Sequence, residues 1–265
     1  MENLVRAELY RVRCRPWPVV LMAATLLFGV VSMLFAEAIR PPEWGNCASM
    51  FEALSTLPIF GMFYGVWCAE ITSSRVNKLD ILKNEAVFGI PRWQMILSRL
   101  MAATLIGCAM VLLLVVSSVL LALLILPGKE ALPVLTLQLV AGFLAALPLW
   151  VAAASLYLCL KVALGSDLMA IFLLFLYHFI LWPILGAWSL IDSDDWVMEL
   201  LCRLHLMTPF WGKGLDITET NFGISVAVSN HFSMPSPLYC WALGLGWIAA
   251  TVAIAVWFLR RRELR

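Results

Sequence analysis

Six apolar stretches, each long enough to cross a lipid bilayer, constrain this chain more than any other feature of its sequence. A helix crosses the hydrocarbon core in roughly 20 residues. The stretches lie near residues 16–36, 53–71, 100–126, 132–160, 168–190 and 237–259. They lack the alternating pattern of transmembrane β-barrel strands, and backbone groups in lipid must be satisfied within their own segment. The sequence therefore predicts an all-α membrane protein, a single domain over residues 1–265 with six transmembrane helices.

The composition and the distribution of charge agree with this prediction and orient it. Hydrophobic residues make up 63% of the chain, charged residues 13%, and the mean hydropathy is +0.92, outside the range of soluble proteins. When both termini are placed in the cytoplasm, 14 of the 18 Lys and Arg residues fall inside, as the positive-inside rule requires, and 10 of the 17 acids fall outside. The net charge of +1 leaves no basic surface that needs nucleic acid as its partner.

Residues 1–15 predict an amphipathic helix that lies along the inner leaflet before the chain turns at Pro16 into the first span. Its apolar face comprises Leu4, Val5, Leu9 and Val12, and its wet face Glu2, Arg6, Arg13 and Arg15. A cleaved signal peptide ending near Ala36-Glu37-Ala38 is the alternative, but the apolar run is longer than the usual core of such peptides, roughly 7–15 residues.

A polar segment over residues 72–92 separates the second span from the third and predicts a short cytoplasmic helix. Apolar residues recur at helical spacing from Val76 to Val87. The polar face carries Lys78, Asp80, Lys83, Asn84 and Glu85. Gly89 supplies the left-handed position that ends helices, and Pro91 suits the start of the next one. A loop that only fixes topology is the simpler alternative, although it needs no such ordered helix.

The start of the third span carries Arg92, Trp93 and Arg99, which we expect at the level of the lipid headgroups. The run from Glu70 through Lys83-Asn84-Glu85, Gly89-Ile90-Pro91-Arg92 and Ser98-Arg99-Leu100 resembles the first cytoplasmic loop of type-2 ABC exporter permeases, in the lantibiotic-immunity and antibiotic-export branch. Glu8 and Arg11 of the N-terminal helix, the six spans and the long outer loop also fit this family. Arg99 stands where the family usually has Lys.

The resemblance implies a permease subunit that is not itself an enzyme and binds no cofactor or metal. In the family two six-helix subunits pair, as identical copies or paralogues, and two cytoplasmic ATPase subunits carry ATP and Mg²⁺ and dock on the coupling helices. The chain has no G-x-x-x-x-G-K-[ST] motif of its own. The predicted ATPase contacts are Lys78, Asp80, Lys83, Asn84, Glu85, Gly89 and Arg92. The resemblance further implies a bacterial cytoplasmic membrane and export of a hydrophobic or amphipathic substrate, such as an antimicrobial peptide or antibiotic.

Other polar residues are candidates for the substrate path or its gating: Glu70, His178, Asp192, Asp194, Asp195 and Trp196. His178 lies at mid-membrane depth, where an ionisable group is a functional candidate, although a neutral histidine hydrogen-bonded inside the bundle is the simpler interpretation. Residues 190–236 form the one large outer loop, in which Asp195 can cap an amphipathic helix starting at Trp196. Such an acidic cover would suit a cationic, membrane-active peptide.

Three further features leave alternatives open. Small residues between Ala141 and Ser155 allow close helix approach, either at a dimer interface or inside the chain. A disulfide among the outer cysteines Cys47, Cys202 and Cys240 is compatible with their location, and small buried thiols are the alternative. A membrane-embedded enzyme would need converging acid, base or metal ligands, of which the sequence shows none, and a secondary transporter would show more charge within its spans. An ATP-independent transporter and a non-transporting interaction protein remain as rivals.

Overall fold

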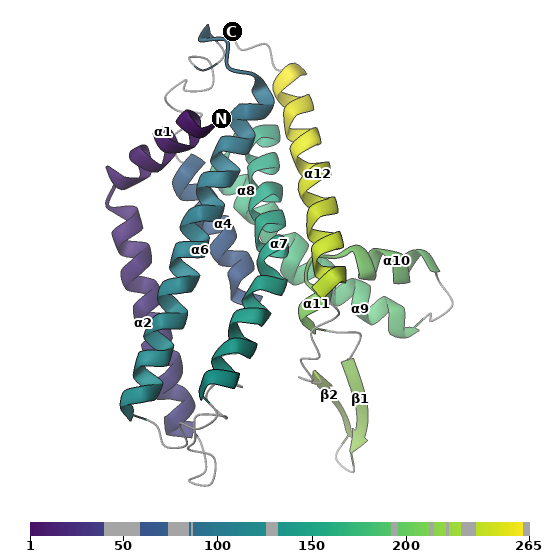
Figure 1. The fold of residues 1–265 in the computed structure, drawn as a ribbon. Coiled ribbons are helices and arrows are strands. Elements are labelled where there is room, and N and C mark those ends of the chain that lie inside the picture. The colour runs from purple at the N-terminus through teal and green to yellow at the C-terminus, as the bar shows by residue number, and fades with distance from the viewer. Residues whose placement is uncertain are drawn as a thin grey trace.

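A computed structural model of the chain describes residues 1–39, 59–73, 85, 87–125, 132–191, 196–211, 215–220, 223–228 and 237–261. These ranges are almost entirely helical, as Figure 1 shows, so the predicted helical class is confirmed. The helices are α1 (Glu2–Arg13), α2 (Trp17–Ile39), α4 (Phe60–Ser73), α6 (Arg92–Ile125), α7 (Leu132–Leu164), α8 (Asp167–Phe175), the π-helix η4 (Leu176–Leu181), α9 (Trp182–Ile191), α10 (Trp196–Leu204), α11 (Thr208–Trp211) and α12 (Pro237–Arg261).

Four described helical segments are long and apolar enough to cross a membrane: Arg92–Leu121, Leu132–Leu164, Asp167–Leu185 and Pro237–Arg261. They coincide with the third to sixth predicted spans. The first predicted span corresponds to α2, which meets α1 at a bend of 75°, and the two helices count as a fifth span if taken together. The second corresponds to α4, whose 14 described residues are too few to qualify, and residues 51–58 before it lie outside the described part.

Helix α7 is the centre of the bundle, with 61% of its most apolar window buried against 22–28% for the other three spanning segments. Glycines on two neighbours allow them to approach it closely. A Cβ atom at Gly65 of α4 would lie 2.5 Å from the carbonyl oxygen of Trp150, and one at Gly244 of α12 would lie 2.6 Å from Pro148. Ala152 and Ala153 are completely buried in the same core. Of the small residues in this span, those from Ala145 to Ser155 are buried and pack within the chain, whereas Ala141 is exposed, so a role for it at a dimer interface stays a prediction.

The predicted outer loop contains more structure than expected. Helix α10 begins at Trp196, as predicted, and lies across the bundle beside α9 and the start of α12 (Figure 1). Strands β1 (Leu215–Thr220) and β2 (Gly223–Val228) form an antiparallel hairpin in which Leu215 pairs with Val228 and Thr220 with Gly223. No strand was expected there, because short alternating segments carry a weak signal beside long apolar helices.

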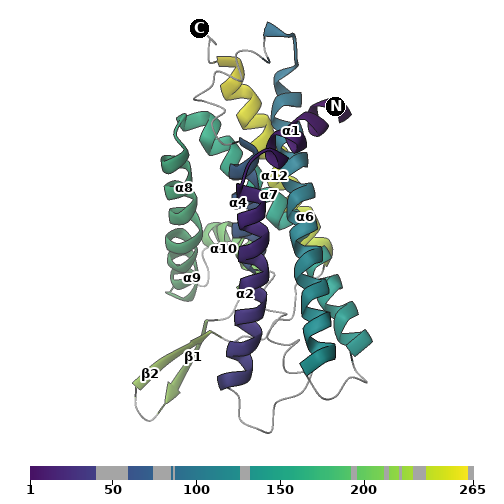
Figure 2. The same ribbon diagram turned by 90° about the vertical axis from the view of Figure 1, so that its left-hand side faces the viewer.

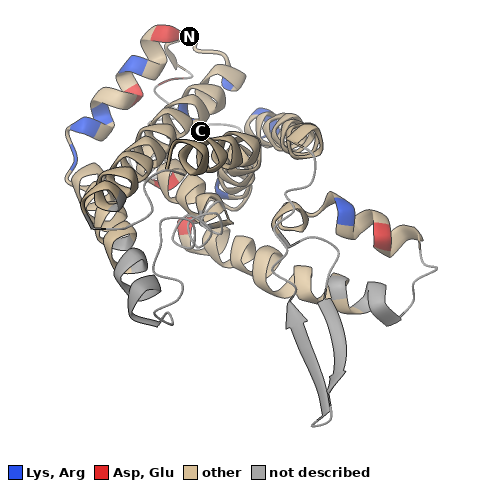
Figure 3. Ribbon diagram, turned by 60° about the horizontal axis from the view of Figure 1, so that its bottom comes forward, with Lys and Arg blue, Asp and Glu red and all other residues tan. Residues whose placement is uncertain are grey.

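The N-terminal helix and the C-terminal end of α12 lie at the same end of the bundle, as two views at right angles show (Figures 1 and 2). Charged residues of the described part gather on α1, on α10 and near the ends of the long helices, which are otherwise uncharged (Figure 3). We call the end that carries α1 and the start of α6 the α1 end.

Candidate functional site

The polar segment between α4 and α6 is described only at Thr72, Ser73, Glu85 and residues 87–92. Gly89 has a φ of +74°, the left-handed conformation expected of a helix stop. The Ile90 N–H donates to the Glu85 carbonyl oxygen at 3.1 Å, the bond that closes a Schellman-type helix end. After Pro91, α6 begins at Arg92, which is partly exposed. The predicted contact residues Lys78, Asp80, Lys83 and Asn84 lie outside the described residues.

Glu85 binds Arg99 in the second turn of α6. One guanidinium nitrogen, Nη2, donates to both carboxylate oxygens of Glu85 at 2.8 Å, and Nη1 donates to the Met95 carbonyl oxygen at 3.0 Å. Arg99 is only 2% exposed, so its side chain turns into the protein, while its depth at the level of the headgroups stays a prediction. A positional pattern identifies the membrane boundary but cannot reveal a buried carboxylate that compensates the charge. The Glu85 carboxylate likewise points inward rather than toward the surface predicted to meet an ATPase.

Helix α1 completes this ionic cluster, which comprises Glu8, Arg11, Glu85 and Arg99. The Arg11 Nη1 lies 3.0 Å from a Glu8 oxygen and 3.6 Å from a Glu85 oxygen, and the Arg99 Nε lies 3.5 Å from Glu8. Glu8 is 4% exposed and sits on the inward face of α1 between the buried residues Val5 and Val12. The two acids and two bases balance, so the cluster ties α1, the polar segment and α6 together without a net buried charge.

A second ionic cluster holds α4, α7 and α8 together at the same end. The Lys161 Nζ lies 2.6 Å from the Glu70 carboxylate and 2.9 Å from Asp167, and the Tyr157 hydroxyl also donates to Glu70. The Lys161 side chain is 4% exposed. The predicted path or gating residue Glu70 is therefore paired with neighbouring helices, and Lys161 and Asp167 are partners that sequence spacing did not reveal.

The mid-membrane residue His178 lies in the π-helix η4, which interrupts the span between α8 and α9. It is 1% exposed, so it lies inside the bundle; neither ring nitrogen makes a hydrogen bond of full geometry among the described residues, although the Leu174 backbone lies close enough to interact with the ring. Its ring centroid lies 4.9 Å from that of Tyr177 and 6.1 Å from that of His205. A π-helix inserts an extra residue into the turn, and such insertions occur often at functional sites.

His205 connects the outer segment to this span and was not identified from the sequence. Its Nδ1 accepts from the Met207 N–H at 3.1 Å, which leaves Nε2 to donate to the Tyr177 carbonyl oxygen at 3.0 Å. The ring stacks on Tyr177 with a centroid distance of 4.2 Å. Burial lowers the pKa of His205 to about 4, so the ring is neutral at ordinary pH.

Helix α10 is held against α12 through backbone carbonyl groups. The Trp247 Nε1 donates to the Leu204 carbonyl oxygen at 2.8 Å, and the Tyr239 hydroxyl donates to that of Arg203. Trp196 is 72% exposed at the start of α10, and the predicted residues Asp192, Asp194 and Asp195 lie outside the described residues. Cys202 and Cys240 are not joined by a disulfide, and Cys47 also lies outside the described part.

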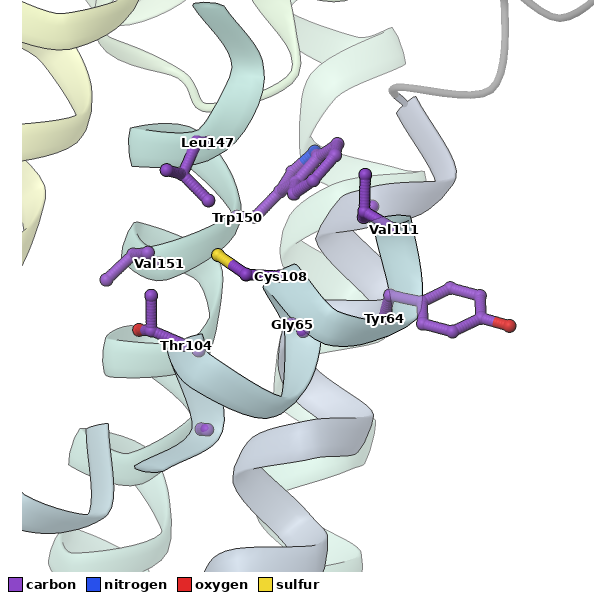
Figure 4. Close-up of a pocket in the computed structure, with 12 residues that line it drawn as sticks. Tyr64, Gly65, Thr104, Cys108, Val111, Leu147, Trp150 and Val151 are labelled. Carbon is purple, nitrogen blue, oxygen red and sulfur yellow. The ribbon is translucent and has the colours of Figure 1, made fainter. Parts of the chain in front are cut away.

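A small pocket, with a cavity volume of about 20 Å³, opens among α4, α6 and α7 (Figure 4). Its wall includes Gly65, Cys108, Leu147 and Trp150. Figure 4 shows the Tyr64 ring turned away from it, and the Tyr64 hydroxyl lies 2.5 Å from Oγ1 of Thr25 in α2. The pocket is mostly apolar and offers none of the converging polar groups that chemistry would require.

No protein-family model matches the chain, and no curated protein matches it either. Within the described ranges, no group of three or more His, Cys, Asp or Glu side chains is placed to hold a metal ion.

Proposed function

We propose that the chain is the membrane-spanning subunit of an ATP-binding cassette exporter, driven by a separate ATPase. The proposal rests on the resemblance of residues 70–100 to the permease family, together with one structural observation. That observation is the buried cluster of Glu8, Arg11, Glu85 and Arg99, which joins the end of the polar segment to two membrane-associated helices.

The cluster suits the transmission of force. A loop that served topology alone would need no buried ion pair, and a buried charge is retained only when its partner is held in place. Here Glu85 is connected to α6 through Arg99 and to α1 through Arg11. A movement of the polar segment would therefore displace α6, and α2 through α1, as connected bodies.

On this proposal the roles of the predicted residues divide in two. Glu85 and Gly89 shape and anchor the segment, whereas the solvent face, comprising Lys78, Asp80, Lys83, Asn84 and Arg92, meets the ATPase. The α1 end then faces the cytoplasm of a bacterial cell, and two ATPase subunits that bind ATP and Mg²⁺ dock on two permease copies or paralogues.

On this proposal, substrate binds at α10 and the segments next to it. Exposed Trp196, Leu200 and Leu204 give α10 an apolar face that can lie in the outer leaflet. We propose that this face, with Asp192, Asp194 and Asp195 before it, receives a hydrophobic or amphipathic substrate such as a cationic antimicrobial peptide. Glu70 and His178 would act in gating, since each lies where helices meet.

The experiment is purification of the tagged chain from its native membrane with identification of co-purifying proteins by mass spectrometry. The test variant is Lys78→Glu/Lys83→Glu, which reverses charge on the predicted docking face but leaves Glu85 and Arg99 intact. The matched control is Arg6→Glu, because Arg6 is an exposed cation on α1. We expect a P-loop ATPase with the native chain and the control, and its loss from the test variant.

Absence of any ATPase under conditions that preserve other membrane complexes would overturn the proposal. An ATP-independent transporter or a non-transporting interaction protein would then take its place. Equal recovery of the ATPase with all three chains would support an ATPase partner but would show that it does not dock on residues 78–83.

A further inference from the structure

A groove runs along the outside of the bundle where the first turns of α6 meet the last half of α12. Its cavity volume is about 600 Å³, within the range of pockets for small ligands, which enclose roughly 300–1,000 Å³. Its lining residues are Trp93, Leu97, Ile248, Ala249, Val252, Ala253, Val256, Trp257 and Arg260. Figures 1 and 2 both show these ends of α6 and α12 side by side.

The groove wall on α12 is supported by buried core. Val252 of the lining packs against a cluster that includes Met95, Ile96, Ala255 and Leu259, each at most 2% exposed. The groove wall on α12 extends from Ile248 to Arg260, which spans about 18 Å at about 1.5 Å per residue. Half of a hydrocarbon core of about 30 Å is about 15 Å, so the groove matches the depth of one leaflet.

The deep part and the shallow part of the groove are lined by different kinds of side chain. The deep part is lined by aliphatic side chains from Ile248 to Val256. The shallow part carries Trp93 and Trp257, 47% and 46% exposed, which are typical of the membrane–water boundary. Arg260 lines this shallow part, and the described lining contains no acidic side chain. The Arg261 guanidinium lies 4.0 Å from the Trp257 ring centroid, a stacking that leaves its N–H edge available for an anion.

We propose that this groove binds one anionic phospholipid, with an acyl chain along α12 and the phosphate at Arg260 and Arg261. The tryptophans mark the headgroup level, the arginines complement its charge, and the groove holds the chain below. Basic sites between transmembrane helices at one membrane face bind anionic headgroups in this manner. The inference does not depend on an ATPase partner.

The test uses the purified full chain in nanodiscs that contain either phosphatidylglycerol with phosphatidylcholine or phosphatidylcholine alone, with retained lipid measured by native mass spectrometry. Two variants probe separate parts of the groove. Arg260→Gln/Arg261→Gln removes the charge, and Ala253→Trp fills the groove while it retains the charge. Controls are Arg6→Gln, which removes an exposed cation on α1, and Ala23→Trp, which adds the same ring at an exposed position on α2.

We expect phosphatidylglycerol to be retained by the native chain and both controls. Each arginine near an anionic headgroup contributes about fivefold, so the double variant should bind about 25-fold more weakly. The Ala253→Trp variant should lose the lipid altogether. Equal retention by all five chains, or equal retention of phosphatidylcholine, would overturn the proposal. So would efficient Ala253→Cys cross-linking between two copies of the chain in anionic nanodiscs, because the groove would then be covered by protein.

Discussion

The α1 end and the α10 region of this bundle are held by different chemistry. At the α1 end, buried ion pairs join distant segments, since Arg99 and Lys161 each bridge acids from two other segments, and one hydrogen bond runs from Arg15 to the Ile71 carbonyl oxygen. In the α10 region the corresponding contacts are aromatic stacking and hydrogen bonds to backbone carbonyl groups, around Tyr177, His205 and Trp247.

The two kinds of contact differ in how much free energy is lost when they break. Breaking one partner of a buried ion pair leaves an uncompensated charge, so the loss of a contact at the α1 end is costly. Stacked rings and single hydrogen bonds are lost gradually and at smaller cost. On the proposed function, the α1 end would receive force and would need the first kind of contact, and the α10 region would adapt to a substrate through the second.

The largest expected effect comes from Arg99→Met at the α1 end. The substitution leaves the Glu85 and Glu8 carboxylates buried without their main cation, which costs roughly 3–5 kcal/mol. Thermal unfolding in detergent, followed by tryptophan fluorescence, measures the loss. Arg99→Lys should lose clearly less, because it retains the charge, although it lacks the separate nitrogens that reach Glu85, Glu8 and the Met95 carbonyl oxygen. Equal stability of Arg99→Met and the native chain would contradict the comparison.

Acid should loosen the α10 region through His205. His205 has a folded pKa of about 4 against 6.5 for an ordinary histidine, so the unfolded segment takes up the proton first as the pH falls. Stability of this region should fall between about pH 6.5 and pH 4, by roughly 3 kcal/mol in total at about 1.4 kcal/mol per pH unit. Hydrogen exchange over residues 196–211 at pH 7 and pH 4.5 measures the change.

The control for acid loosening is His205→Gln, which keeps an amide donor but does not titrate. Its hydrogen exchange should depend little on pH once the intrinsic exchange rate is corrected for. An unchanged pH dependence in this variant would assign the loosening to another group.

A smaller effect is expected for Gly89→Ala. The φ of +74° costs an alanine roughly 1–2 kcal/mol, although no atom lies within 4 Å of the added Cβ. Gly246→Ala in α12 is the matched control, because its Cβ also meets nothing within 4 Å and its backbone is helical. Thermal unfolding of the two variants side by side should show a loss for Gly89→Ala alone.

The smallest effect is expected for the ion pair on the exposed side of α10. The Arg203 Nη2 lies 2.7 Å from Glu199, but the two side chains are 56% and 45% exposed. Such pairs contribute at most about 0.5 kcal/mol. Arg203→Gln should therefore unfold at nearly the native temperature, and a loss comparable to that of Arg99→Met would show that the two regions do not differ in the proposed way.

Sequence periodicity predicted the elements that depend on local chemistry. The spans over 100–126, 132–160, 168–190 and 237–259, the amphipathic α1 and the left-handed Gly89 all follow from hydropathy, helical spacing and glycine's missing Cβ. What periodicity could not reveal is which faces of the helices meet. Hydropathy measures affinity for an apolar environment, and lipid and protein interior are equally apolar.

The missed contacts all join residues that are remote in the chain or lie in irregular turns. Arg99 looked like a headgroup anchor because its partners lie 14 and 91 positions earlier, at Glu85 and Glu8. The π-helix around His178 has the same apolar composition as a membrane-spanning α-helix, so the local sequence did not predict it. His205 gave one usable signal: a histidine beside an amphipathic helix, close in sequence to a Thr-Pro helix start.

The most direct test of a driven permease is site-specific photocrosslinking in native membranes. A photoreactive residue placed at Asn84, on the predicted docking face, is compared with one at Val197, which is 39% exposed on α10. We expect the probe at position 84 to capture an ATPase that contains a P-loop motif, and the probe at position 197 to capture none. Failure at position 84 with a folded, membrane-inserted chain, or capture of the same ATPase at position 197, would contradict the central claim.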